Sequence, residues 1–92
     1  MIGQVSTIHL AQNYPNPFNP ATIINYQLGN DGFISLKVFN SFGEEVAVVI
    51  DDYQSARNYK ITFNGNDLPS GIYVYQLISG NYFESKKMLL MK

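Results

Sequence analysis

The chain has 92 residues, of which 46% are hydrophobic and 14% charged, a composition that fits one small folded domain and excludes a disordered tail. Six basic and seven acidic side chains give a net charge of −1, which excludes a long-range field that would attract nucleic acid or an anionic membrane. Because cysteine is absent, a disulfide framework and a thiolate metal site or nucleophile are excluded, and no apolar run is long enough for a transmembrane helix.

Apolar residues alternate with a period of two along most of the chain, which predicts short strands rather than helices. We interpret residues 1–9 as the start of an expressed fragment or a linker, including the start of a first strand at about Thr7–Ala11, and residues 10–92 as one domain. Four further strands are expected before residue 64, separated by turn signals such as Asn30-Asp31-Gly32. Their predicted core-facing side chains are Ile24, Tyr26 and Leu28; Ile34, Leu36 and Val38; Val46, Val48 and Ile50; and Tyr59, Ile61 and Phe63.

The segment 72–78 (IYVYQLI) is apolar on both faces, which is typical of a central strand covered on both sides. Gly80-Asn81 predicts a two-residue hairpin loop of type II′, because glycine tolerates a positive φ at the first loop position. A last strand at about 82–91 then pairs antiparallel with residues 71–79. Seven short strands of this kind predict an all-β fold, an immunoglobulin-like antiparallel β-sandwich.

A proline-rich segment, Tyr14 to Pro20, separates the first two predicted strands. Pro15, Pro17 and Pro20 fix φ and remove backbone donors, which predicts a rigid polyproline-like corner that carries the first strand across to the other sheet. In this interpretation Tyr14 and Phe18 fill the core. The alternative is a proline-rich ligand for an aromatic groove.

The residue types needed for catalysis do not occur in an arrangement typical of an active site. His9 is the only histidine and has no acid near it in sequence, so we expect it at the surface or the edge of the core. The adjacent pairs Glu44-Glu45 and Asp51-Asp52 point to opposite faces of a strand and cannot act together as acid and base. We therefore predict no enzyme activity, no cofactor and no catalytic residue. A calcium site at Asp51, Asp52 or Asn66-Asp67 stays a minor alternative.

Two features near the C-terminus do not follow from a generic sandwich. Gly71 stands where the chain enters the segment 72–78, and we expect it to provide a positive φ or a close backbone approach. Lys86, Lys87 and Lys92 are three of the six basic residues and enclose an apolar run, Met88 to Met91. These lysines protect the edge of a last strand in one interpretation and form part of a recognition signal in the other.

Four motifs in this order resemble the type A C-terminal sorting domain of the type IX (Por) secretion system of Bacteroidetes and related bacteria. The resemblance runs from about Leu10 to Lys92 and departs from the family in the segment 52–58, where many members have a glycine-rich turn. The motifs are QNYPNPFNPATIINYQL (12–28), VFNSFGEEVAVVI (38–50), DLPSGIYVYQL (67–77) and ESKKMLLMK (84–92).

The resemblance implies an immunoglobulin-type domain at the C-terminus of a secreted protein, which directs an N-terminal passenger from the periplasm across the outer membrane to the cell surface or medium. It also implies an outer-membrane translocon and a sortase-like peptidase as partners, removal of the domain after export, and neither nucleic-acid binding nor stable membrane insertion. The implied recognition residues are Gly71, Tyr73, Lys86, Lys87 and Lys92, and the implied structural residues are Pro15, Asn16, Pro17, Pro20 and Gly43.

From these features we hypothesise that the last hairpin, Gly71–Lys92, offers a strand edge and lysines to an outer-membrane receptor. An immunoglobulin-like spacer or a carbohydrate-binding module of a secreted enzyme is the main alternative. Exposed aromatic side chains such as Tyr53, Tyr59 or Tyr82 would serve the sugar-binding version.

Overall fold

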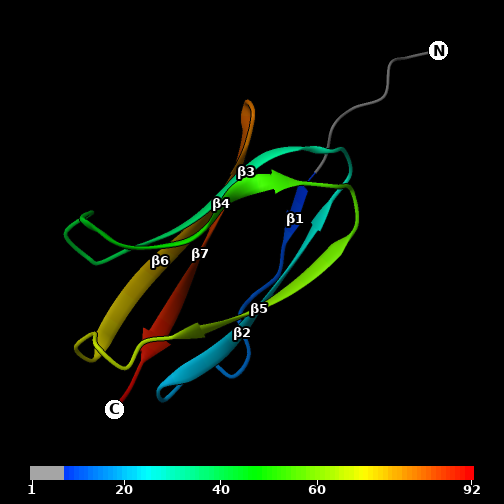
Figure 1. Cartoon of the computed structure of the whole chain (residues 1–92). Coiled ribbons are helices and arrows are strands. Elements are labelled where there is room, and N and C mark those ends of the chain that lie inside the picture. Colours follow the sequence, from blue (N-terminus) through cyan, green and yellow to red (C-terminus); the bar gives the residue numbers. More distant parts are fainter. Residues whose placement is uncertain (1–7) are drawn as a thin grey trace.

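The computed structural model describes residues 8–92, so Thr7 and most of the predicted linker lie outside the described residues. This part of the chain forms seven strands in two sheets and contains no helix (Figure 1). It therefore has no helix that could cross a membrane. The strands are β1 (Ile8–Leu10), β2 (Ala21–Leu28), β3 (Gly32–Phe39), β4 (Glu45–Gln54), β5 (Asn58–Asn64), β6 (Gly71–Ser79) and β7 (Tyr82–Leu90).

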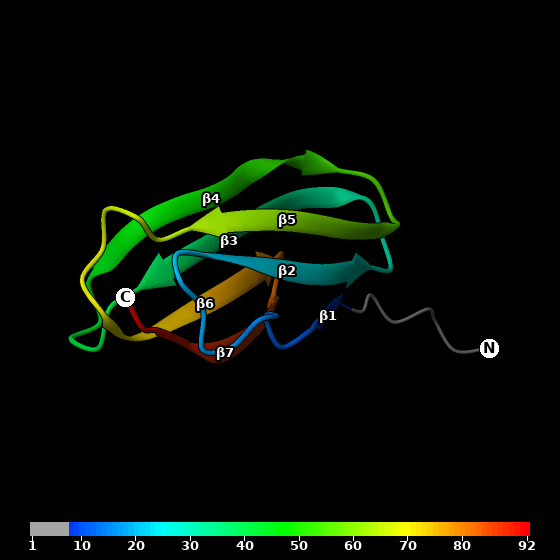
Figure 2. The same ribbon diagram turned by 90° about the horizontal axis from the view of Figure 1, so that it is seen from below.

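The two sheets pack face to face, which confirms the predicted β-sandwich of seven strands (Figure 1). One sheet has the order β1-β2-β5 and the other the order β4-β3-β6-β7, with all neighbouring strands antiparallel. In a constant-type immunoglobulin domain the fourth strand pairs with the fifth, whereas here β4 pairs with β3. The described chain begins and ends at opposite ends of the sandwich (Figure 2).

The core lies between the sheets and contains most of the side chains that the period-two pattern assigns to it. The predicted sets on β2 and β3 are fully buried, and on β5 Phe63 is buried while Tyr59 and Ile61 pack against the core. Leu10, Phe18 and the inward side chains of β6 and β7 complete it. The buried residues contributed by β6 and β7 are Tyr73, Tyr75, Leu77, Met88 and Leu90.

The prediction for β4 was wrong at Val48, which is 50% exposed. The pairing of β4 with β3 slips twice: Leu36 faces Ile50, but the next residue, Lys37, faces Val48. An extra residue in one strand reverses which side chains point inward beyond it. Simple alternation therefore fails along β4, and Ala47 and Val49 pack against the core instead.

β6 lies in the middle of its sheet, but the prediction that it is covered on both sides was wrong. Its side chains alternate, so that Tyr73 is buried while Ile72, on the opposite face, is 53% exposed. The hairpin after β6 is confirmed, because Ser79 pairs with Tyr82 and Gly80 has a φ of +60°. A type II′ turn requires a positive φ at its first central residue and a negative φ at its second. Asn81, the second central residue, accordingly has no positive φ.

The proline-rich segment does not transfer the chain between sheets as predicted, because β1 and β2 are neighbours in one sheet. It leaves β1, reaches the edge of β7 in the other sheet at Phe18, and returns to β2. Phe18 is buried in the core as predicted, but Tyr14 is 76% exposed, so the prediction that it fills the core was wrong.

Candidate functional site

The β6–β7 hairpin places all five predicted recognition residues in the half of the sheet that is nearest the C-terminus. Gly71 pairs with Leu90 and Tyr73 with Met88, while Lys87 pairs with Val74 and Lys86 with Tyr75. Paired residues of antiparallel strands project to the same face of the sheet. Lys86 therefore lies on the inner face with buried Tyr75, and Lys87 lies on the outer face with Val74.

Tyr73 is buried, with 4% of its surface exposed, so its side chain cannot contact a partner of the folded domain. Its hydroxyl donates a hydrogen bond of 2.6 Å to the carbonyl oxygen of Pro69, four residues earlier. A tyrosine bonded to the backbone in this way, at the start of the equivalent strand, is a recurrent feature of immunoglobulin-like sandwiches. Tyr73 therefore holds the β5–β6 connection against the core.

Gly71 provides a positive φ (+156°), and a side chain added there would meet no other atom within 4 Å. Of the two roles predicted for Gly71, the structure thus favours the positive φ. Close approach occurs instead at Gly65, where an added Cβ would lie 3.0 Å from Leu90 Cδ2 and 3.4 Å from Phe18 Cε2. This role of Gly65 is not apparent from the sequence, because it depends on two distant segments.

The three lysines have different surroundings. Lys86 is half-buried and Lys87 is exposed. Lys92 folds back on the β5–β6 connection, where its Nζ donates to the carbonyl oxygen of Asn66 at 2.6 Å. None of the three forms an ion pair with another described residue, since the one ion pair found in residues 8–92 joins Lys37 to Glu45 at 3.3 Å.

The edge of β7 is covered where the strand-addition hypothesis needs it open. The backbone N–H of Phe18 donates to Leu89 at 2.9 Å, and the carbonyl oxygen of Phe18 accepts from Met91 at 3.0 Å. Asn16 Oδ1 accepts from the Leu89 N–H at 2.9 Å, and Gln12 Nε2 donates to the Lys87 carbonyl oxygen at 2.6 Å. The hypothesis of a free edge is therefore wrong for residues 87–91.

Two of the structural residues of the first motif, Pro15 and Pro20, act through their carbonyl groups. Pro15 O accepts from Asn13 Nδ2 at 3.1 Å and from the Thr22 hydroxyl at 2.8 Å, and Pro20 O accepts from the Gly65 N–H at 2.8 Å. Pro17 stands between Asn16 and Phe18, the two residues of this segment that bond to β7.

Tyr75 and Asn13 connect this segment to the core, and neither role is apparent from the sequence. The Tyr75 hydroxyl accepts from the Asn13 N–H and donates to Ala11 O, each at 2.7 Å. Burial raises the pKa of Tyr75 to about 12. In residues 8–92 every buried side-chain nitrogen or oxygen has a hydrogen-bond partner.

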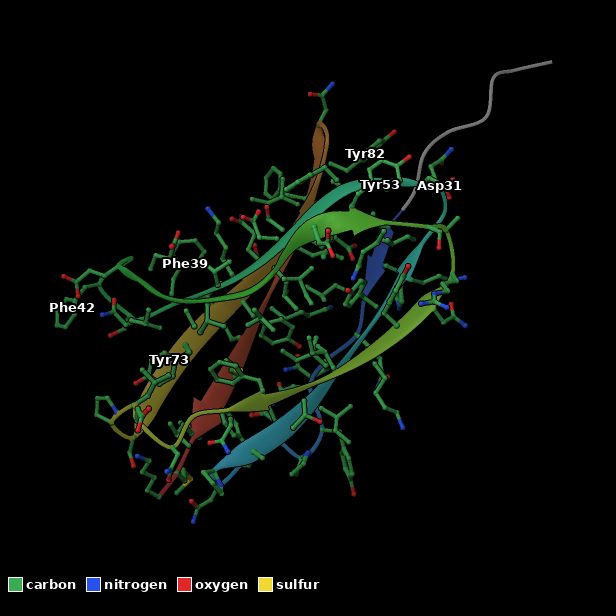
Figure 3. All side chains as sticks on the ribbon, viewed as in Figure 1. Asp31, Phe39, Phe42, Tyr53, Tyr73 and Tyr82 are labelled. Carbon is green, nitrogen blue, oxygen red and sulfur yellow. The ribbon has the colours of Figure 1, made fainter. Side chains whose placement is uncertain are left out.

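The turn between β3 and β4 is built by Asn40 and Gly43. The side-chain oxygen of Asn40 accepts from the N–H groups of Phe42 at 2.9 Å and Glu44 at 3.0 Å. Gly43 has a φ of +83°, in the left-handed region that glycine adopts most readily. Phe42 lies at the tip of this turn and is 87% exposed (Figure 3).

A groove of about 550 Å³ lies on the outer face of the sheet, between this turn and the β6–β7 hairpin. Lys87 and the outward side chains of β6 line it. The signal for this groove is present in the sequence, because 72–78 is apolar on both faces. The lining residues are Phe39, Asn40, Ser41, Gly43, Ile72, Val74, Gln76 and Lys87.

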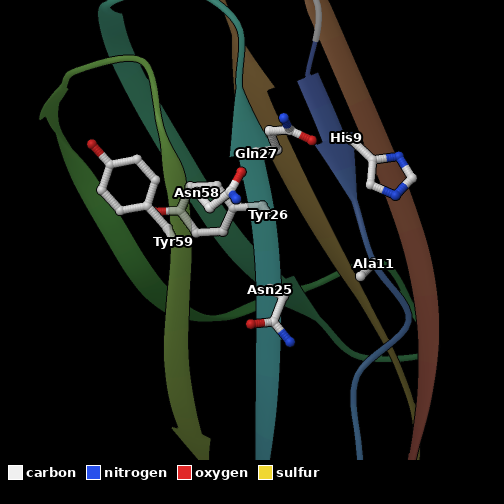
Figure 4. A pocket seen from close by; sticks show the side chains of 7 residues that line it. All are labelled: His9, Ala11, Asn25, Tyr26, Gln27, Asn58 and Tyr59. Atoms are coloured by element: carbon white, nitrogen blue, oxygen red, sulfur yellow. The ribbon is translucent and has the colours of Figure 1, made fainter.

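A second hollow, of about 310 Å³, lies on the β1-β2-β5 sheet and contains His9, which is exposed (Figure 4). His9 stands opposite Gln27, and the other lining residues include two asparagines and two tyrosines but no carboxylate. This set offers hydrogen bonds but no acid–base pair. No group of three or more metal-ligating side chains gathers anywhere in residues 8–92.

The three tyrosines named for the sugar-binding alternative do not form one platform. Tyr53 is on β4 and Tyr82 on β7, whereas Tyr59 is on β5, in the other sheet. Tyr59 is half-buried and stacks on Tyr26, with 5.1 Å between the ring centroids. A coplanar row of these side chains is therefore absent.

Comparison with known proteins identifies one family. The family model described as "Secretion system C-terminal sorting domain" matches residues 12–91, nearly the whole chain and the same region that the four sequence motifs cover. No curated protein matches the chain significantly.

Proposed function

The chain belongs to the type IX secretion system C-terminal sorting domains, and from this membership we propose that it is the non-catalytic signal for export of a passenger protein on its N-terminal side. The observation that carries the proposal is the family match over residues 12–91. Domains of this family are generally non-catalytic, and the surface hollows described above contain no acid–base pair, which supports a role in recognition.

The proposed route begins in the periplasm, where the passenger has arrived by a separate signal peptide. The outer-membrane translocon then recognises residues 10–92, and a sortase-like peptidase removes them after export to the cell surface or medium. A net charge of −1, which gives no long-range field toward nucleic acid or an anionic membrane, supports a domain that binds proteins, with neither nucleic-acid binding nor stable membrane insertion.

Within this function we assign different parts to the five residues of the recognition motifs. Lys86, Lys87 and Lys92 are assigned to the contact with a receptor, since none has a carboxylate partner among the described residues. Lys87 is the most open of the three, because Lys86 is half-buried and the Lys92 Nζ donates to Asn66 O. Gly71 and Tyr73 act indirectly by setting the path of the chain into β6. The burial of Tyr73 and the positive φ of Gly71 support this division.

The proposal is tested by joining a signal peptide and a fluorescent reporter to the N-terminal side of residues 10–92 in a bacterium with a working type IX system. We expect the reporter at the cell surface or in the medium, and in the periplasm of a strain without the translocon. A folded, intact fusion that stays in the periplasm of the competent strain would contradict the proposal and favour the spacer or sugar-binding alternative.

A further inference from the structure

The outer face of the β4-β3-β6-β7 sheet has an apolar area at the end of the sheet that lies nearest the C-terminus of the chain. In one row across the sheet Phe39 pairs with Val74 and Val74 with Lys87, and in the next row Ile72 pairs with Leu89. Apart from Lys87 these side chains are apolar, and Ile72 is 53% exposed. We name Phe39, Ile72, Val74, Leu89 and Lys87 together the outer-face patch.

The patch is hollowed rather than flat. The groove of about 550 Å³ runs past Phe39, Val74 and Lys87, and a smaller hollow of about 160 Å³ continues it beyond Ile72 and Lys87 toward Asn16 and Leu89. Ile72 and Lys87 line both hollows and so lie at the centre of the patch. The β3–β4 turn with exposed Phe42 forms one border (Figure 3).

The charge of the patch is positive and uncompensated. Glu45 stands in the same row, opposite Phe39, but its carboxylate is paired with Lys37 at 3.3 Å. Lys87 is exposed and has no carboxylate partner in the described part of the chain. An ammonium group beside an apolar groove is complementary to a partner that brings an apolar side chain and a carboxylate together.

A second copy of this chain fits the patch less well. In a twofold dimer the same surface meets itself, so the central Lys87 of one copy would approach Lys87 of the other. Such a contact brings like charges together in an apolar surrounding, which is unfavourable. The covered edge of β7 at residues 87–91 also removes strand addition at that edge, next to the patch.

We propose that the outer-face patch is the surface through which the export machinery binds this domain, with an apolar side chain of the partner against Ile72 and a partner carboxylate at Lys87. This inference rests on the proposed function and refines it, because it moves the contact from the strand edge to the face of the sheet. It also adds Ile72, Val74 and Phe39 to the lysines expected from the sequence motifs.

The test uses the reporter fusion with Lys87→Glu or Ile72→Ser, each with a control change of the same kind. Lys60→Glu alters an exposed lysine on the other sheet, and Phe83→Ser alters a side chain that is 65% exposed at the far end of the same face. We expect Lys87→Glu and Ile72→Ser to lower exported reporter at least about tenfold, as loss of a central contact does, with both controls near wild type. Lys87→Arg, which keeps the charge, should be exported.

Thermal unfolding of each purified domain establishes that the variants are folded. If wild type is exported and both folded patch variants are exported equally well, the inference is wrong and the proposed function stands. If wild type itself is not exported, the proposed function fails as well. The wild-type domain should be a monomer by light scattering, and a dimer disrupted by Ile72→Ser would assign the patch to a second copy and overturn the inference.

Discussion

Tyr75 shows how a single polar side chain joins the two sheets of this domain. It is fully buried on β6, yet its hydroxyl bonds to Ala11 O and the Asn13 N–H in the segment that follows β1. Removal of the hydroxyl would leave both backbone groups without this partner. A buried donor or acceptor without a partner costs about 1–3 kcal/mol of folding free energy.

The Tyr75 hydroxyl also predicts how stability depends on pH. Its pKa is about 12 in the folded domain, because burial disfavours the phenolate, and about 10 in an unfolded chain. Between these values the unfolded chain releases the proton that the folded domain keeps, so the free energy of unfolding decreases as pH rises. Below about pH 10 the contribution of the Tyr75 hydroxyl to the free energy of unfolding is fully present.

We therefore expect the urea midpoint of the wild-type domain to be steady from about pH 7 to 9 and to fall above about pH 10. Tyr75→Phe should be less stable at neutral pH and should lose less of its stability in the alkaline range. Equal alkaline losses in both proteins would show that Tyr75 does not cause the effect.

The sequence predicts single residues well where nothing interrupts the alternation of a strand. Ile24, Tyr26 and Leu28 are buried as predicted, because β2 pairs regularly with β5. Val48 is not, because the register slips, and the sequence carries no clear sign of the bulge. The burial of Asn13 was also missed, since its partners include Tyr75, which is 62 residues away.

Among the elements, β7 depends most on a distant part of the chain. Phe18 bonds to Leu89 and Met91, so the proline-rich segment acts as an additional short pairing partner of the last strand. The sequence predicts both segments and the β6–β7 hairpin. It does not predict that the two segments meet, because neither proline content nor alternation specifies a partner.

Gly65 tests how tightly these elements pack. An added Cβ at Gly65 would lie 3.0 Å from Leu90 Cδ2, and both Leu90 and nearby Phe18 are buried and cannot move into solvent. We expect Gly65→Ala to reduce the free energy of unfolding by about 1–3 kcal/mol, the usual effect of overpacking. Urea denaturation measures the change.

Gly32→Ala is the matched control for this experiment. Gly32 begins β3 without a positive φ, and no atom lies within 4 Å of an added Cβ, so the change should alter stability by less than about 0.5 kcal/mol. Equal stability of the two variants would show that the contact of Gly65 with Leu90 is not tight.

In the whole molecule, the outer-face patch and the start of the described chain lie apart. The described chain starts at one end of the sandwich, while the C-terminus and the β3–β4 turn that borders the patch lie at the other (Figure 2). The proposed receptor could therefore approach the patch while the proposed passenger occupies the opposite end. The lysine-rich motif points to this end of the molecule. The apolar pattern of 72–78 predicts a covered face, whereas Ile72 on the outer face of β6 is exposed.

The central claim is that export machinery contacts the outer face of the sheet near Ile72. The most direct measurement places a photo-crosslinking amino acid at position 72 of the reporter fusion in exporting cells, with positions 83 and 9 as exposed controls on the far end of the same face and on the other sheet. We predict an adduct with an outer-membrane export component from position 72, and little or none from the controls. Adducts with that component from position 83 or 9, and none from position 72, would contradict it.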